Sequence, residues 1–303
     1  MELDSAPLAG IALAVASAAA LSLGNLLQGR GVHEMETRAS GGADGSKIIH
    51  LLRNHSWLIG ALLLLVAILL QMGSLTFAPL VVVQPIGVVA LVITVLVTSI
   101  MAKQAPSRDV VRAIVTCVVG VAAFVTVAAL VSTQHAITDV QLIAILAVLG
   151  SVLLATGVFV VFGRKRPAPP VLWVLLGGIY SAFVATLGKT VILRVQTALK
   201  QHDLSFDTEN LLTLACLLGI GIAGALSIFF VQRAHASNRP EVVVAGLTVV
   251  DPAIAVVLGI TILGEASSAP VWAIFAFVVA GAVSIAGVFS LSRAESAAAA
   301  TPS

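Results

Sequence analysis

Residues Leu80–Ala102 read LVVVQPIGVVALVITVLVTSIMA, and this stretch contains no charged residue. A helix needs about 20 mostly apolar residues to cross the hydrocarbon core of a bilayer, so the stretch predicts one membrane span. Across the 303 residues, 59% are apolar and 10% are charged, and the mean hydropathy is +1.11. Soluble globular chains are usually about half apolar and a quarter charged. The composition therefore predicts an integral membrane protein whose main partner is the lipid bilayer.

The same length criterion finds nine spans along the chain. They cover Leu8–Gln28, Trp57–Phe77, Leu80–Ala102, Val110–Val131, Val140–Phe162, Val171–Leu193, Leu211–Val231, Val242–Leu263 and Val271–Leu291. We predict an all-α fold, a polytopic transmembrane bundle of nine helices that forms a single membrane domain over residues 1–303. A cytoplasmic linker is expected at 31–56 and a disordered cytoplasmic tail at 293–303.

The distribution of positive charges predicts the orientation of these spans. Of the sixteen Lys and Arg residues, thirteen fall in the loops of one side, two fall on the other side, and Lys189 lies within a span. Cytoplasmic loops carry the excess of Lys and Arg, so the richer side is expected to be the cytoplasm. This interpretation predicts a multi-pass protein of the plasma membrane with its N-terminus outside and its C-terminus in the cytoplasm.

A weak internal repeat relates the two ends of the chain. Leu8–Gln28 matches Val171–Leu193, and Leu80–Ala102 matches Val242–Leu263. The matched residues include Ser17 with Ser181, Gly24 with Gly188, Asn25 with Lys189, Arg30 with Arg194, Gln84 with Asp251, Pro85 with Pro252 and Thr94 with Thr261. With nine spans the matched helices cross in opposite directions. We therefore predict inverted four-helix repeats at 6–132 and 170–292, joined by a linking fifth helix at 138–163. Secondary transporters share this arrangement, with their substrate near the midplane.

Three stretches carry a resemblance to a known family. They are FAPLVVVQPIG at Phe77–Gly87, DPAIAVVLGITILGE at Asp251–Glu265, and the Gly188-Lys189 step. This pattern resembles the drug/metabolite transporter (DMT) superfamily, within it the nine-helix NIPA-like branch of magnesium transporters, and the second stretch is similar to EamA-like domains. The resemblance implies an inverted-repeat transporter fold, and its branch implies magnesium transport.

A few polar side chains within the spans are the candidate binding residues. An ionisable side chain at membrane depth costs roughly 2.5–3.5 kcal/mol, usually faces the bundle interior and often marks function. Asp251 and Lys189 are the two in this class, and the repeat supplies Gln84 and Asn25 as their counterparts. Gln71 is a fifth candidate. We predict that these five residues line a substrate or ion pathway.

Two prolines accompany the candidate polar residues. Pro85 and Pro252 directly follow Gln84 and Asp251. Proline removes a backbone donor and frees a carbonyl one turn earlier, so both are predicted to break their helices beside the binding residues. Ordinary kinks are the alternative.

Other interpretations of the polar residues stay open at this point. Lys189 is close enough to Arg194 to reach the outer headgroups instead. Asp251 and Lys189 would also fit a structural pair that fixes helix packing. Gln71 and Gln84 would equally serve as interhelical hydrogen-bonding groups.

The sequence favours a secondary transporter that moves a small organic metabolite, a drug-like compound or a lipid-linked molecule by alternating access. A magnesium or other divalent-cation transporter is the alternative, although only one deep carboxylate is expected and Mg²⁺ prefers carboxylates and carbonyl oxygens. A non-transporting membrane scaffold is a third option. No catalytic constellation is visible, so neither an enzyme, a cofactor nor a resident metal is predicted. A net charge of +2 disfavours nucleic-acid binding, and stripes of small residues leave a homodimer open.

Overall fold

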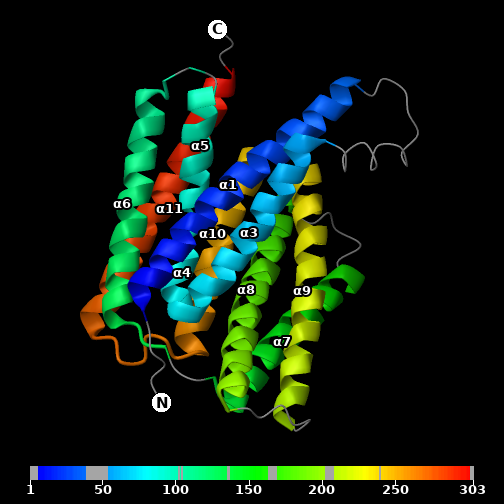
Figure 1. Ribbon diagram of the computed structural model, residues 1–303, viewed down its shortest axis with the longest axis vertical. Helices are drawn as coiled ribbons and strands as arrows, with labels where there is room; N and C mark the ends of the chain where they lie inside the picture. The colour runs from blue at the N-terminus through cyan, green and yellow to red at the C-terminus, as the bar shows by residue number, and fades with distance from the viewer. Residues whose placement is uncertain are drawn as a thin grey trace.

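The computed structural model is helical in all the regular secondary structure that it describes, as the sequence predicts. It describes residues 6–38, 54–101, 103, 105–134, 137–162, 169–201, 208–238 and 240–300. The helices in these ranges are α1 (Pro7–Arg38), α3 (His55–Phe77), α4 (Leu80–Ile86), α5 (Val89–Met101), α6 (Arg108–Val131), α7 (Asp139–Phe162), α8 (Pro170–Gln201), α9 (Thr208–Ser237), α10 (Pro240–Thr261) and α11 (Val271–Ala300). Within the described part, nine segments are long and apolar enough to cross a membrane (Figure 1). The chain is an integral membrane protein with a nine-helix bundle.

The third of these segments is not one continuous helix. It divides into α4 and α5 at Gly87-Val88, where the amide of Gly87 donates to the carbonyl of Gln84 and that of Val88 donates to Pro85. These three-residue turns replace the four-residue ladder directly after Pro85. Pro252, by contrast, lies inside α10 without interrupting it. Only the first of the two predicted helix breaks is therefore observed.

Two helices also run further than expected. Helix α1 continues to Arg38, through residues assigned to the linker, and residues 39–53 of that linker lie outside the described part. Close contact with α3 accounts for this, because a Cβ on Gly31 would lie 2.7 Å from the Cβ of Trp57. Helix α11 continues to Ala300, where a disordered tail was expected from residue 293. Alanine has the highest helix propensity, and the alanine-rich sequence extends the last turns.

The contacts between helices follow the predicted inverted repeats. Helix α1 packs against α3, α4 and α5 in the first half, and α8 packs against α9 and α10 in the second. Helix α7 packs against α8 and α9. In Figure 1, α1 runs from the lower to the upper end of the bundle, and α8 runs from the upper to the lower end. The two halves thus have matching internal contacts and opposite directions.

The halves meet through α6 with α11, through α4 with α10 and through α3 with α8. The first contact is very close, because a Cβ on Gly120 would lie 2.4 Å from the amide nitrogen of Ser284, and one on Gly287 would lie 2.4 Å from that of Cys117. Small residues allow this approach of two backbones, which provides van der Waals contact between membrane helices.

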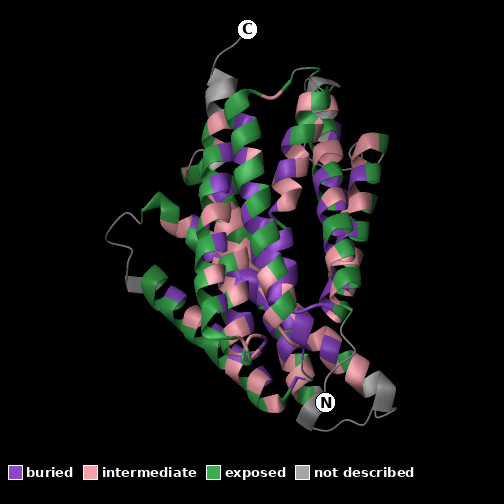
Figure 2. Cartoon of the chain, turned by 90° about the vertical axis from the view of Figure 1, so that its left-hand side faces the viewer, coloured by how far each residue is buried: buried purple, intermediate pink, exposed green. Residues whose placement is uncertain are grey.

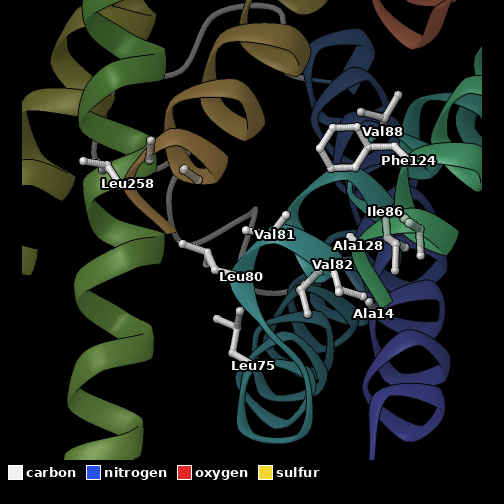
Figure 3. Close-up of a cluster of buried hydrophobic side chains, with 14 of the residues drawn as sticks. Ala14, Leu75, Leu80, Val81, Val82, Ile86, Val88, Phe124, Ala128 and Leu258 are labelled. Atoms are coloured by element: carbon white, nitrogen blue, oxygen red, sulfur yellow. The ribbon is translucent and has the colours of Figure 1, made fainter. Parts of the chain in front are cut away.

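The short helix α4 lies at the centre of the packed core. Every residue from Leu80 to Ile86 is buried. Figure 2 shows buried residues gathered inside the bundle, most densely toward the end where α1 begins. Figure 3 shows Leu80, Val81 and Val82 of α4 between Ala14 of α1, Leu75 of α3 and Leu258 of α10. Helix α4 therefore contacts both halves of the molecule.

Candidate functional site

A buried ion pair joins α8 to the turn that follows α10. The ammonium Nζ of Lys189 lies 2.5 Å from Oε1 of Glu265, and the two side chains are 1% and 3% exposed. Lys189 therefore does not extend to the headgroups, and its ionic partner is Glu265 rather than Asp251. Both alternatives raised for Lys189 from the sequence, contact with the headgroups and a pair with Asp251, are therefore wrong.

Backbone groups of the first half complete this cluster. The carboxylate of Glu265 accepts hydrogen bonds from the amides of Leu80 (2.8 Å) and Val81 (2.9 Å), and Lys189 donates to the carbonyl of Ala78 (3.2 Å). The first amides of a helix have no partner within it, so Glu265 satisfies two of them at the start of α4. We call these five residues the charged node. It links the second half of the chain to the joint between α3 and α4.

Local backbone structure places Glu265 in the node. Gly264 adopts φ +68°, a left-handed conformation that glycine tolerates without strain, and it turns the chain back after α10. The amide of Glu265 then donates to the carbonyl of Gly259 (3.1 Å). A Cβ on Gly259 would lie 2.9 Å from Oε2 of Glu265, so the absence of a side chain there makes room for the carboxylate.

The loops around the node bind to one another and cap this end of the bundle. Glu265 accepts a hydrogen bond at its carbonyl from the amide of Thr133 (2.8 Å). Gln134 donates to the carbonyl of Thr76 (3.1 Å), and Gln141 donates to that of Leu263 (3.1 Å). Arg194 donates to the carbonyl of Ile137 (3.1 Å) and pairs with Asp139. We call this the capped end.

Asp251 occupies a separate position between α10 and α8. Its Oδ2 accepts a hydrogen bond from the hydroxyl of Ser181 (2.6 Å). Its Oδ1 is buried and has no hydrogen-bond partner among the described residues. A Cβ on Gly178 would lie 2.7 Å from the side chain of Val250 and 3.3 Å from the amide of Asp251. The two helices are thus in close contact at this carboxyl group.

An apolar cavity of about 440 Å³ lies between α4, α6, α10 and α11, helices that belong to both halves. Its walls include both prolines of the repeat, Pro85 and Pro252, and both rings of the contact between Phe124 and Phe277 (centroids 4.9 Å apart). Thr248 and Ser284 are the two lining residues with polar side chains. On α10 and α11 the lining residues lie in the middle part of each helix, between Thr248 and Val257 and between Phe277 and Val288.

The five predicted pathway residues do not converge on one site. Asn25 is exposed on α1, Gln71 is half-buried on α3, and Gln84 is buried on α4. Lys189 lies in the charged node and Asp251 contacts Ser181. None of the five lines the cavity, whereas Pro85 and Pro252 do. The exposed position of Asn25 breaks the expected equivalence with Lys189, because its side chain faces out of the bundle.

Glu265 was not among the site residues predicted from the sequence. It follows α10, whereas the predicted ionisable candidates lie within the apolar spans. Its place at the end of the Asp251–Glu265 stretch was the available signal. Ser181 had a similar signal, since the repeat matched it with Ser17.

Comparison of the chain with protein-family models, curated proteins and solved structures finds no match. The fold defines the class of protein: an integral membrane protein with a nine-helix bundle. A buried ion pair lies at one end of the bundle, and an apolar cavity lies between the halves.

Proposed function

We propose that this protein is a secondary transporter that moves a small organic, drug-like or lipid-linked molecule by alternating access. The observation that carries the proposal is the cavity. Equivalent prolines from the two oppositely directed halves, Pro85 and Pro252, lie in the same cavity wall. Inverted-repeat transporters bind their substrates between the repeats, and this cavity occupies that place.

The charged node supports the same interpretation. Lys189 and Glu265 belong to the second half, whereas Ala78, Leu80 and Val81 belong to the first. Any rearrangement that opens the capped end between the halves must separate these groups. In this proposal the node is the closure that the conformational cycle breaks and re-forms.

The lining favours a substrate with a substantial apolar part. Valine, proline, alanine, isoleucine and phenylalanine side chains form most of the wall. Burial of apolar surface stabilises a complex by roughly 25 cal/mol per Å², and such a pocket offers a hydrated ion no compensating ligands. We also propose that the chain belongs to the drug/metabolite transporter superfamily.

Magnesium transport, which the NIPA-like resemblance implies, is the second candidate. Its supporting observation is the presence of a buried carboxyl group on Glu265 and a half-buried one on Asp251. Glu265 is already neutralised by Lys189 and two amides, and no group of three His, Cys, Asp or Glu side chains gathers within the described residues. Because Mg²⁺ prefers several oxygen ligands in near-ideal octahedral geometry, we rank it below an organic substrate.

A cavity-filling variant tests the proposal. A Cβ on Gly281 would meet only the ring of Phe124, at 3.9 Å, so leucine at this position enters the cavity. Purified protein is tested by thermal shift against ethidium, tetraphenylphosphonium, decanoate and magnesium chloride. A ligand of the folded state raises the melting temperature. We expect at least one organic compound to do so in the native protein and not in Gly281→Leu.

The matched control is Gly221→Leu, on α9, where a Cβ would meet no atom within 4 Å. This variant should keep the ligand-dependent shift. A compound that passes this test is then measured for uptake into proteoliposomes. If magnesium alone stabilised the protein, and Asp251→Asn or Glu265→Gln removed that effect, the organic substrate would be excluded in favour of the second candidate.

A further inference from the structure

Asp251 is half-buried, with its Oδ1 atom fully shielded, and only one of its two carboxyl oxygens has a hydrogen-bond partner among the described residues. Ser181 donates to Oδ2, and Oδ1 has no partner among the described residues. Neither Lys189 nor any other described cation forms an ion pair with it. This contrasts with Glu265, whose carboxylate has one ammonium and two amides around it.

Among the residues whose side chains are described, the charged and titratable groups on the helices packed against α10 are engaged or distant. On α4 there are none. On α8, Tyr180 donates to Thr156, and Lys189, eight residues beyond Ser181, lies about 12 Å further along the helix axis and is held by Glu265. Arg194 pairs with Asp139. On α9, Cys216 is buried, Arg233 lies over the ring of Trp173 and His235 is exposed, while on α11 Arg293 is exposed.

An ionised carboxylate in this position would be an uncompensated charge in an apolar interior, which is far more costly than a neutral acid. The neutral form needs no cation and leaves Oδ1 as a hydroxyl. Gly178 brings α8 close to the backbone of α10 at Asp251, and Oδ1 is buried in the same interface. This packing therefore favours the protonated acid over the carboxylate.

We propose that Asp251 is the proton-binding residue of this protein, neutral in the observed conformation and ionised in a conformation where α8 and α10 separate. In the reversible step, one proton is taken from water on one side of the membrane and forms the O–H bond at Oδ1. The bond breaks in the other conformation, and the proton is released to water on the opposite side. No electron transfer or other reactant is involved.

Because Asp251 lies on α10, its protonation affects both the cavity and the charged node. The same helix contributes Pro252 to the cavity wall and ends at the turn that places Glu265 in the charged node. A change in the packing of α10 against α8 therefore also moves Pro252 in the cavity wall and the turn that carries Glu265. The proton is then the coupling ion for the cavity's substrate, an inference that rests on the proposed function.

Infrared difference spectroscopy of the protein in lipid tests the proton site without any substrate. Spectra are compared between about pH 5 and about pH 9, a range that covers perturbed protein carboxyls. We expect the carbonyl band of a buried protonated carboxyl to disappear at alkaline pH in the native protein and to be missing from Asp251→Asn at every pH. Asp109→Asn, at a carboxyl whose side chain is 79% exposed, should keep the band and its pH dependence.

Coupling is tested on proteoliposomes by the transient charge displacement that follows a pH jump. The native protein and Gly281→Leu should both give this signal, and Asp251→Asn should lose it while retaining its melting temperature. If the band or the charge displacement survives in Asp251→Asn, the proton site is wrong, and ligand shifts that depend on Gly281 would still support the transporter. If the proton signals depend on Asp251 but no organic compound binds, the proposed function and its coupling fall.

Discussion

Lys189 and Glu265 form an ion pair that is almost completely buried, and it lies at a junction of three chain segments. The pair connects α8 to the turn after α10, and both partners also bind the joint between α3 and α4. A single pair of side chains thus connects the two oppositely directed halves. Substitution of Glu265 and substitution of Lys189 should therefore lower the free energy of unfolding by different amounts.

Loss of Glu265 should be the more damaging change. Glu265→Ala leaves the ammonium of Lys189 and the amides of Leu80 and Val81 without their acceptor. Breaking a buried pair in this way typically costs about 3–5 kcal/mol. Lys189→Met should cost less, because the remaining carboxylate keeps two amide donors. Equilibrium unfolding in detergent measures both values, and an equal or reversed order would show that the amide contacts contribute little.

The pair between Arg194 and Asp139 offers a contrast at the same end of the bundle. Its side chains are 15% and 43% exposed, so the charges are partly solvated. Exposed ion pairs contribute about 0–1 kcal/mol, and Arg194 retains its bond to the carbonyl of Ile137 in Asp139→Asn. We expect this variant to unfold within about 1 kcal/mol of the native protein. If Asp139→Asn lost as much free energy of unfolding as Glu265→Ala, burial would not explain the greater contribution of the Lys189–Glu265 pair.

The close contact of α6 with α11 should be sensitive to one methyl group. Alanine at Gly287 would place its Cβ 2.4 Å from the backbone nitrogen of Cys117, so the two helices must move apart. Alanine normally stabilises a helix by about 1 kcal/mol relative to glycine. We expect the overlap to outweigh this gain and the melting temperature of Gly287→Ala to fall. At the open position of Gly221, the same substitution should leave it unchanged or raised.

The orientation inferred from the positive charges remains to be tested by labelling. Ser268 follows α10 at the capped end, and Ala105 lies between α5 and α6 at the opposite end (Figure 1). In Cys117→Ala/Cys216→Ala protein, a membrane-impermeant maleimide should label Ser268→Cys in intact cells. Ala105→Cys should react only after permeabilisation. The reverse pattern would place the N-terminus in the cytoplasm.

Hydropathy alone predicts most of this fold, because nine apolar segments have few alternatives in a bilayer. The ends of α1 and α11 were less predictable, since contact with Trp57 and alanine propensity extend them into polar sequence. The helix breaks after Pro85, at the turn of Gly87-Val88, but not after Pro252. The presence of a proline alone does not predict this difference.

The site was predicted only in part, for a physical reason. Composition identifies Lys189 and Asp251 as costly groups in a membrane, but it does not identify their partners. Glu265 lies outside the apolar segment, and only the left-handed turn at Gly264 brings it inward. Asn25 shows the opposite error, because a sequence match to Lys189 does not determine which face of a helix is buried.

The central claim is that the capped end opens and closes between the two halves. Electron–electron distance measurements between spin labels at Phe77→Cys and Ser268→Cys, in the Cys117→Ala/Cys216→Ala protein in lipid, test it most directly. Both positions are exposed and they belong to different halves. We predict a shorter and a longer population, with Lys189→Met shifting the distribution toward the longer one. A single distance that is the same in both proteins would contradict alternating access at this end.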